Sequence, residues 1–256
     1  VRNRDHTGDV AIADQHHAAA EVAQFRNEIG MARTIEHADD DIAGLDTLGS
    51  GNGLVDVLYG DVNPSGRLPF TIAKQRSDYP ADVMYTSDAT TPQIYYSEGL
   101  NIDYRHFDKE NIEPRYEFGY GQSYTTFHYL PGASGKWIGD KKKAASAKGV
   151  YPKAIFEPVY EISFELKNVG HTDGWEVPQV YLGFPANTGE PPKVLRKFDR
   201  YFLKAGESKK IKYQFSAYDL SIFDVTKQHF VMPSGKTTVM IGASSRDIRR
   251  TFAIQD

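Results

Sequence analysis

Two adjacent histidines are the first residues in this sequence whose side chains could do chemistry. His16 and His17 would diverge by about 100° on a helix, so they cannot hold one metal ion as a pair four residues apart could. The acidic run at residues 36–41 lies at no fixed spacing from them. The sequence therefore predicts no metal site.

Nucleophilic and cofactor-binding motifs are absent from the sequence. There is no cysteine, so disulfides and thiolate sites are excluded. No Gly-x-Ser-x-Gly motif, phosphate-binding Walker loop or dinucleotide fingerprint occurs. We therefore expect no cofactor.

Composition limits the partners. The 256 residues carry 30 basic and 34 acidic side chains, a formal net charge of −4, which gives no electrostatic reason to bind nucleic acid or an anionic membrane. No transmembrane run or signal peptide is visible. Because Val1 stands where a start methionine would, we expect a processed protein or a fragment.

A glycine-rich stretch at residues 50–72 resembles an active-site loop, because it is rich in glycine and a helix begins in it. Its pattern favours a structural role instead. Asn52 can cap a helix of about two turns that Gly60 closes in the left-handed conformation. Residues 63–66 then suit a turn, and residues 68–72 alternate as a strand. Because Pro69 cannot donate a ladder hydrogen bond, that strand should lie at an edge or a bulge.

The middle of the chain has three regions that differ in composition. Residues 74–92 are polar and rich in turn signals, so we expect an exposed, irregular excursion. Residues 95–127 are dense in aromatic side chains, which favours packing at the join of two domains, with a sugar-stacking platform as the alternative. Within it, residues 104–108 could form an Arg–Asp pair that braces the join. Residues 131–155 are predicted to be a linker or long loop.

The last hundred residues have the pattern of an all-β domain. Residues 159–166 alternate strictly, with Tyr160, Ile162, Phe164 and Leu166 on one face. Further strands are predicted at 177–182, 194–203, 208–215, 229–232, 236–242 and 250–254. About seven short strands at this spacing predict an antiparallel sandwich.

Three segments resemble consecutive signatures of one family. They are SGNGLVDVLYGDVNPSGRLPFTIAK, YSEGLNIDYRHFDK and PRYEFGYGQSYTTFHY. In this order they resemble fungal family 3 glycoside hydrolases, the β-glucosidases, and the resemblance covers roughly residues 49–256. It implies a multidomain α+β chain: the C-terminal part of an α/β sandwich domain at 1–130 (with 1–48 poorly matched), a linker at 131–155, and a fibronectin type III-like β-sandwich at 156–256.

The resemblance also says where catalytic carboxylates should be sought. A retaining glycosidase needs two carboxyl groups about 5 Å apart. The family's nucleophile is the aspartate of a Ser-Asp-Trp motif on an N-terminal barrel, and no such barrel fits in this chain. Ser77-Asp78-Tyr79 imitates the motif, but its position predicts that Asp78 is a surface residue.

The acid/base residue of the family is a glutamate upstream of the glycine-rich stretch. Glu21, Glu28 and Glu36 lie upstream but match no motif, so each is predicted to be a solvated residue. Glu98 lies inside a signature, where a carboxylate that accepts backbone N–H bonds in a tight turn explains it as well. We therefore predict no catalytic residue in this chain, and both carboxylates outside it.

Taken whole, the resemblance implies part of a secreted β-glucosidase active in cellulose degradation. Such an enzyme hydrolyses terminal non-reducing β-D-glucosyl residues of cello-oligosaccharides or glucosides without a cofactor, binds its substrate through the barrel, and could form a homodimer. The alternatives are a non-catalytic structural or interaction module and a β-xylosidase of the same family.

Overall fold

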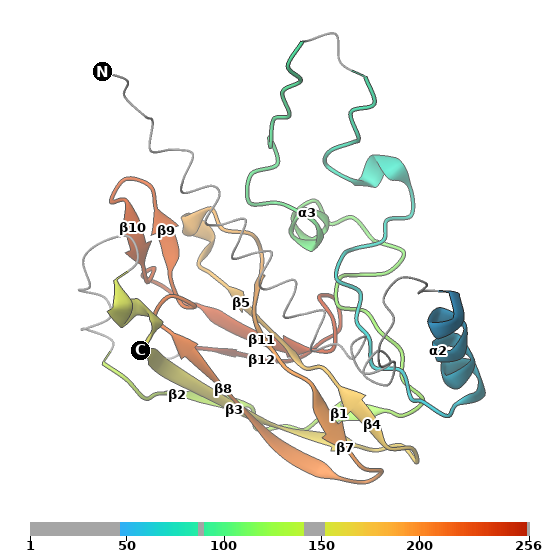
Figure 1. The fold of residues 1–256 in the computed structure, drawn as a ribbon. Helices are drawn as coiled ribbons and strands as arrows, with labels where there is room; N and C mark the ends of the chain where they lie inside the picture. The colour runs from blue at the N-terminus through green and yellow to red at the C-terminus, as the bar shows by residue number, and fades with distance from the viewer. Residues whose placement is uncertain (1–46, 87–89, 141–151, 255–256) are drawn as a thin grey trace. The chain divides into compact units, whose positions relative to one another are not determined.

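The computed structural model describes residues 47–86, 90–140 and 152–254 (Figure 1). The chain divides into two compact units: residues 1–66 with 122–124, and residues 67–121 with 125–256. Among the described residues, no helix has the length and apolarity needed to cross a membrane.

The described part of the first unit contains one helix, α2 (Thr47–Tyr59). It begins five residues before Asn52, so the prediction that Asn52 caps it is wrong. Gly51 and Gly53 lie inside the helix, where a glycine costs only about 1 kcal/mol relative to alanine, and two glycines do not stop it. The predicted end is confirmed, because Gly60 has φ +87°.

Residues 63–66 do not form the predicted local turn. The Asn63 carboxamide oxygen instead accepts hydrogen bonds from the Ser123 hydroxyl (3.0 Å) and the Tyr124 amide (2.9 Å). The Tyr124 hydroxyl donates to the Val57 carbonyl of α2. A short segment far along the sequence thus holds the chain that leaves the helix.

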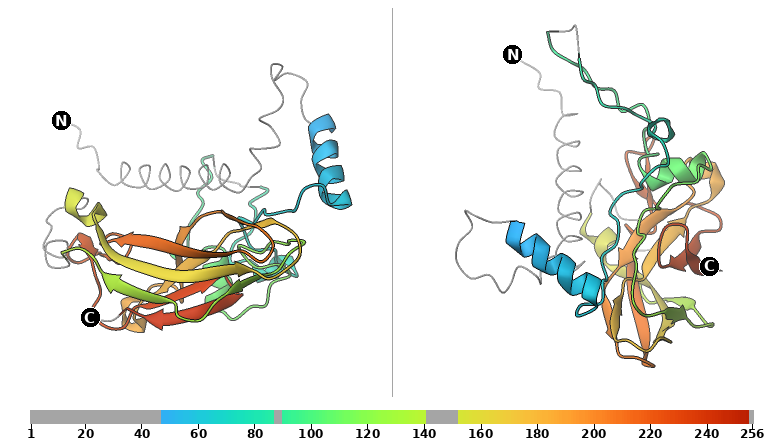
Figure 2. Two further views of the ribbon diagram at one scale, coloured as in Figure 1. Left: turned by 90° about the horizontal axis from the view of Figure 1, so that it is seen from below. Right: turned by 90° about the vertical axis from the view of Figure 1, so that its right-hand side faces the viewer.

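The second unit is built on two antiparallel sheets (Figures 1 and 2). In one sheet β3 pairs along one edge with β8 and along the other with β1 and β2. These strands are β1 (Phe127–Tyr129), β2 (Ser134–Trp137), β3 (Pro158–Asn168) and β8 (Ser208–Ser216). The other sheet has the order β12 (Ile248–Ala253), β11 (Thr238–Gly242), β5 (Gln179–Gly183) and β6 (Val194–Phe198).

A two-stranded ladder, a hairpin and short 3₁₀ helices also belong to the described part of this unit. The ladder pairs β4 (Gly174–Glu176) with β7 (Tyr201–Leu203), and the hairpin joins β9 (Ile222–Asp224) to β10 (His229–Val231). The 3₁₀ helices are η1 (Arg76–Asp78), η2 (Lys153–Phe156) and η3 (Ala186–Thr188). The predicted antiparallel sandwich is confirmed.

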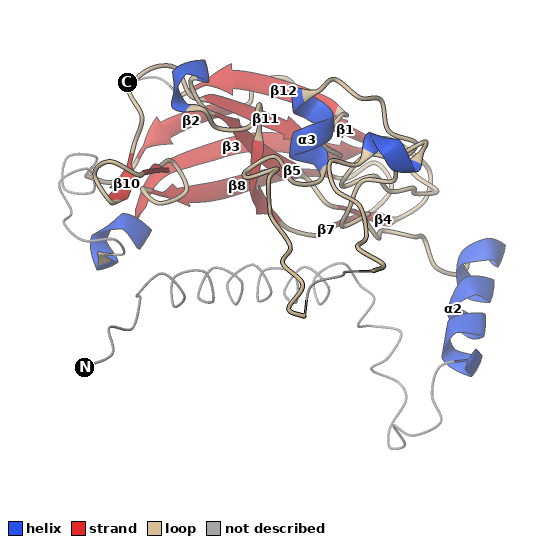
Figure 3. Cartoon of the chain, turned by 90° about the horizontal axis from the view of Figure 1, so that it is seen from above, coloured by secondary structure: helices blue, strands red, loops and turns tan. Residues whose placement is uncertain are grey.

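The core lies between the two sheets. The predicted inward face of β3 is confirmed, since Tyr160, Ile162, Phe164 and Leu166 are all buried together with Val180, Leu182, Val239 and Ile241 of the facing sheet. β5 departs from the predicted alternation, because all five of its residues are buried. Its second face is covered by α3 (Tyr104–Lys109), whose Tyr104 ring meets the Tyr181 ring edge-on at 5.9 Å (Figure 3).

The stretch predicted to be a linker, residues 131–155, contains a strand of the sandwich. β2 pairs with β3 from Ser134–Ser163 to Trp137–Tyr160. Gly135 makes this possible, because a Cβ there would lie 2.4 Å from the Tyr160 hydroxyl oxygen. The small residues that resembled a flexible linker instead leave room for a tyrosine ring; residues 141–151 lie outside the described residues.

The predicted strand at residues 68–72 is reduced to one bridge, between Ile72 and Tyr116. The Leu68 amide still donates to the Tyr120 carbonyl (2.8 Å) and the Ile72 amide to the Tyr116 carbonyl (2.8 Å). Pro69 lies between them and has no N–H to donate. The edge character predicted from Pro69 is therefore present without a continuous ladder.

Candidate functional site

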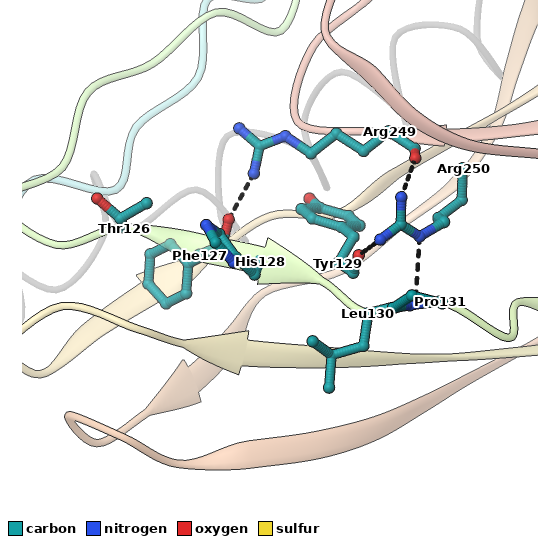
Figure 4. Close-up of a pocket in the computed structure, with 8 residues that line it drawn as sticks. All are labelled: Thr126, Phe127, His128, Tyr129, Leu130, Pro131, Arg249 and Arg250. Carbon is teal, nitrogen blue, oxygen red and sulfur yellow. Dashed lines mark hydrogen bonds between the residues drawn. The ribbon is translucent and has the colours of Figure 1, made fainter.

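An open groove of about 520 Å³ lies between the edges of the two sheets (Figure 4). One wall is β1 with its flanking residues, Thr126 to Pro131, and the other is formed by Arg249 and Arg250 of β12. No carboxylate lines it. The groove therefore lacks the two carboxyl groups that hydrolysis by a retaining glycosidase requires.

The two arginines of the groove are already bound. Arg249 donates to the Phe127 carbonyl (2.6 Å) and to the Asp247 carboxylate (2.6 and 3.0 Å), and hydrogen bonding to Asp247 raises the pKa of Arg249. Arg250 donates to the carbonyls of Leu130 (2.9 Å) and Tyr129 (Figure 4). These bonds satisfy carbonyls of an edge strand, which is a structural task.

A buried ion pair lies behind this groove. An Arg67 guanidinium nitrogen is 2.9 Å from Glu176 Oε1, and both side chains are 4% exposed. The Tyr129 hydroxyl is 3.2 Å from the same oxygen, and burial together with the nearby Glu176 charge raises the Tyr129 pKa well above its usual value. This cluster ties residue 67, early in the second unit, to strands β1 and β4.

A second buried carboxylate fixes α3. Asp108, with a side chain 5% exposed, lies 2.6 Å from the Lys193 ammonium and 2.8 Å from the Arg246 guanidinium. Arg246 also donates to the carbonyls of Phe107 and Ile112 (3.0 Å each). The bracing pair predicted within residues 104–108 is thus wrong in its partners: the aspartate pairs with distant cations, and Arg105 contacts Tyr104 instead.

The predicted surface residue Asp78 has a local structural role. Its two carboxylate oxygens accept from the Gln75 amide (3.1 Å) and carboxamide (3.0 Å) around η1. The hydrogen bonds around Glu98 differ from the predicted ones. The turn N–H groups of Gly99 and Asn101 bond to the carbonyls of Tyr96 and Glu98, while Glu98 Oε2 is buried without a hydrogen-bond partner.

The remaining sequence candidates lie outside the described residues. They are His16, His17, Glu21, Glu28 and Glu36. Over residues 47–86, 90–140 and 152–254, no group of three or more histidines or acidic residues is placed to hold a metal ion.

The aromatic run divides into two parts. Tyr104, Phe107 and Phe127 are buried, as the packing interpretation predicts. Tyr95 and Tyr96 are exposed, so packing within this chain does not account for them. The sandwich uses the first part, and the second remains available to a partner.

Sequence reasoning missed Arg67, Glu176 and Tyr129 as a unit. One signal was present, because Glu176 directly precedes an apolar run that was predicted to be a strand, and a charged residue there needs a partner. Nothing in the spacing identified Arg67, which lies 109 residues away.

The antiparallel sandwich, in which cations bind the buried carboxylates of Glu176 and Asp108, defines the class of this chain: a β-sandwich protein. Residues 176–245 match the fibronectin type III-like domain, and residues 42–124 match the glycosyl hydrolase family 3 C-terminal domain. The chain belongs to glycoside hydrolase family 3, over the C-terminal portion of that family.

Curated relatives support the same placement. The chain is 46% identical over 212 residues to "Probable beta-glucosidase L" of Aspergillus fumigatus, which is 81% of this chain and 28% of the relative. It is 47% identical over 212 residues to the protein of the same name in Neosartorya fischeri. The chain therefore spans less than a third of the length of these relatives.

Solved structures agree in fold. The β-D-glucoside glucohydrolase of Trichoderma reesei superposes with a TM-score of 0.72 at 41% identity, covering 82% of this chain and 29% of that one. The β-glucosidase 3B of Thermotoga neapolitana, solved with glucose, gives a TM-score of 0.64 at 31% identity, covering 81% and 27%.

Proposed function

We propose that this chain is the non-nucleophilic C-terminal part of a retaining β-glucosidase. The observation that carries the proposal is the 46% identity over 212 residues to a relative named as a probable β-glucosidase. The substrates would be terminal non-reducing β-D-glucosyl residues of cello-oligosaccharides or glucosides. The enzyme would be secreted and would take part in cellulose degradation, as expected for fungal enzymes of this family.

The reaction requires two carboxyl groups that this chain does not supply. One attacks the anomeric carbon and forms a glycosyl-enzyme intermediate, while the other protonates the leaving oxygen and later takes a proton from the attacking water. We assign both to the barrel and the upstream half of the α/β domain, which would also bind the sugar. No cofactor enters this scheme.

The task of this chain in that scheme is to hold the α/β domain against the sandwich. Arg67 with Glu176, and Asp108 with Lys193, tie residues of the predicted α/β portion (1–130) to the sandwich (156–256). We propose that 131–155 joins the two portions, with β2 contributed to the sandwich.

A non-catalytic module is the second candidate. It is favoured by the described carboxylates themselves: Glu176 and Asp108 are bound to cations, and Asp78 to Gln75. Such a module could also associate as a homodimer. A β-xylosidase of the same family is a third candidate, because sugar selection would rest on the barrel.

A chimera tests the proposed function. Residues 49–254 of this chain would replace the matched 212 residues of the Aspergillus fumigatus relative. We expect the chimera to hydrolyse 4-nitrophenyl β-D-glucoside faster than the β-D-xyloside, with the β-anomer released first by NMR. The native relative is the control. A folded chimera that hydrolyses neither substrate would contradict the proposal.

A further inference from the structure

One segment of the second unit exposes many apolar side chains. We call residues 79–86 and 90–102 the tyrosine-rich loop; its described residues form no helix or strand. It exposes nine large apolar side chains: Tyr79, Val83, Met84, Tyr85, Ile94, Tyr95, Tyr96, Leu100 and Ile102. Large apolar side chains exposed in this number on one segment are typical of an interaction site, and long loops without secondary structure are usually functional.

The base of this loop is firmly held, whereas the tyrosine rings beyond the base are largely exposed. The Tyr79 hydroxyl donates to the Thr71 carbonyl (3.1 Å), and the Tyr79 ring meets the Phe107 ring of α3 edge-on at 5.7 Å. Beyond it, Tyr85, Tyr95 and Tyr96 are 75%, 79% and 70% exposed. Figure 1 shows both limbs of the loop leaving the region of α3. A fixed base presents the exposed tyrosines to a partner.

Glu98 gives a second, independent indication of a partner. Its Oε2 atom is buried and has no hydrogen bond in the described chain. A buried carboxylate oxygen without a donor costs free energy, and such atoms in native proteins are nearly always satisfied. The missing donor must come from a group outside the described contacts.

The charge of the loop indicates the chemistry of the surface that it would bind. Residues 79–102 contain Asp82, Asp88 and Glu98 and neither lysine nor arginine. Asp82 is already paired with Arg76 (2.6 Å). The loop therefore fits an apolar surface that receives tyrosine rings and carries an arginine or backbone N–H for Glu98.

We propose that the tyrosine-rich loop docks onto the part of a family 3 glycoside hydrolase that lies outside this chain, with Glu98 as the acceptor at its edge. The inference rests on the proposed function. Residues 42–124 match the family, so the loop belongs to it, yet this chain spans only 26–28% of its curated relatives. Most of the polypeptide of those relatives therefore lies outside the part that matches this chain.

Hydroxyl-radical footprinting with mass spectrometry tests the docking directly, on the purified chain and on the chimera described above. We expect the oxidation rates of Tyr95 and Tyr96 to fall about tenfold in the chimera, because a ring buried in an interface core loses its solvent contact. Phe223, on the β9–β10 hairpin and 39% exposed, is the control and should react equally in both proteins. Equal reactivity of Tyr95 and Tyr96 in both would overturn the proposal.

Substitution of Glu98 separates docking from a role inside this chain. Glu98→Ala should lower the melting temperature of the chimera by about 5 °C without lowering that of the chain, because only the chimera holds the donor. Val225→Ser, at an exposed apolar residue elsewhere, should change neither. An equal loss in both proteins would show that Glu98 acts within the chain and would overturn its assigned role.

Self-association is the competing result. Sedimentation of the chain at rising concentration should show a monomer with reactive tyrosines; a dimer that protects Tyr95 and Tyr96 would overturn the proposal in favour of a second copy. Footprinting does not depend on hydrolysis. An active chimera with unprotected tyrosines refutes only the docking, and an inactive chimera with protected tyrosines refutes only the proposed function.

Discussion

Glu176 has the most demanding environment of the residues described. It is 3% exposed, it carries a charge, and its neutralising partner Arg67 comes from a distant part of the sequence. Burying two ions is costly, and their attraction offsets that cost only while both are present. The intact pair therefore contributes little net stability, whereas removal of one partner destabilises the protein strongly.

The first prediction concerns that pair. Glu176→Gln keeps the shape of the side chain and removes its charge, so we expect the free energy of unfolding to fall by about 3–5 kcal/mol because the Arg67 guanidinium stays buried and unpaired. Urea denaturation of the chain measures this loss. As a control, Lys136→Ala removes an exposed partner of Glu161 and should leave the urea midpoint unchanged.

Replacement of both partners sharpens the same test. Arg67→Met with Glu176→Leu leaves no buried charge, so the double variant should be more stable than Glu176→Gln alone. A double variant as unstable as the single one would mean that the hydrogen bond from Tyr129, rather than the charge pairing, dominates this cluster.

At the scale of the elements, α3 depends on one unusual cap. Asp103 has φ +52°, and its carboxylate accepts from the Thr71 amide (2.8 Å), the Thr71 hydroxyl (2.8 Å) and the Tyr104 amide (2.5 Å). A φ of this sign favours glycine, so the hydrogen bonds of the Asp103 carboxylate hold a backbone conformation that other residues rarely adopt. One side chain therefore holds both the start of the helix and the 68–72 segment.

The second prediction follows from the cap. Asp103→Ala should cost about 2–3 kcal/mol, because the cap is lost, the Thr71 groups lose their acceptor, and alanine is strained at this φ. Asp103→Asn retains an acceptor and the conformation, so it should cost clearly less. Thermal unfolding followed by circular dichroism compares the two. Equal losses would show that the negative charge, not the geometry, is what matters.

The third prediction concerns β2. Gly135→Ala should destabilise the chain by about 1–3 kcal/mol, since the new Cβ would overlap the Tyr160 ring, whose Cε1 would lie only 2.5 Å away. Ser134→Ala, on the same strand with an exposed side chain, is the matched control and should change the urea midpoint little. A tolerated Gly135→Ala would mean that β2 is not held against Tyr160 as described.

The strands also show which structural features a sequence pattern can predict. The alternation of β3 identified its buried face correctly, because one face of that strand is solvated and the pattern has period two. β5 could not be placed the same way, since α3 covers the face that would otherwise be solvated. Gly135 was predicted to lie in a flexible linker. The Tyr160 ring, which leaves no room for a Cβ at residue 135, is 25 residues away in sequence, so the local pattern could not reveal this contact.

At the candidate site, too, some features could be predicted from the sequence and others could not. The position of Asp78 in a polar loop was sufficient to predict a surface residue, although it did not predict the hydrogen bonds to Gln75. The partners of Glu176 and Asp108 could not be predicted, because they depend on which strands become neighbours in the folded sandwich. Local pattern carries no information about such long-range ion pairs.

At the scale of the whole molecule, buried tyrosines should set the alkaline limit of stability. Burial raises the pKa of Tyr129, Tyr181 and Tyr213 well above the usual value of 10.0. In each case the folded state holds the proton more tightly than the unfolded state. The stability linked to these groups is therefore fully present below pH 10 and is lost as the pH rises towards the folded-state pKa values.

The fourth prediction is the pH dependence itself. Above pH 10 each such tyrosine should lower the free energy of unfolding by about 1.4 kcal/mol per pH unit. Tyr213→Phe removes one titrating group and should make that slope shallower by this amount, whereas Tyr95→Phe, at an exposed ring, should not change it. Urea denaturation between pH 8 and pH 11 measures the slope. An unchanged slope for Tyr213→Phe would mean that Tyr213 ionises as readily in the folded chain.

The central claim is that this chain belongs to a β-glucosidase but contains no catalytic carboxylate pair. The most direct test is hydrolysis of 4-nitrophenyl β-D-glucoside by the purified 256-residue chain, with the chimera as the positive control. We predict no turnover above that of buffer for the chain and measurable turnover for the chimera. Turnover by the chain that co-purifies with it and is abolished by Asp78→Asn or Glu98→Gln would contradict the claim.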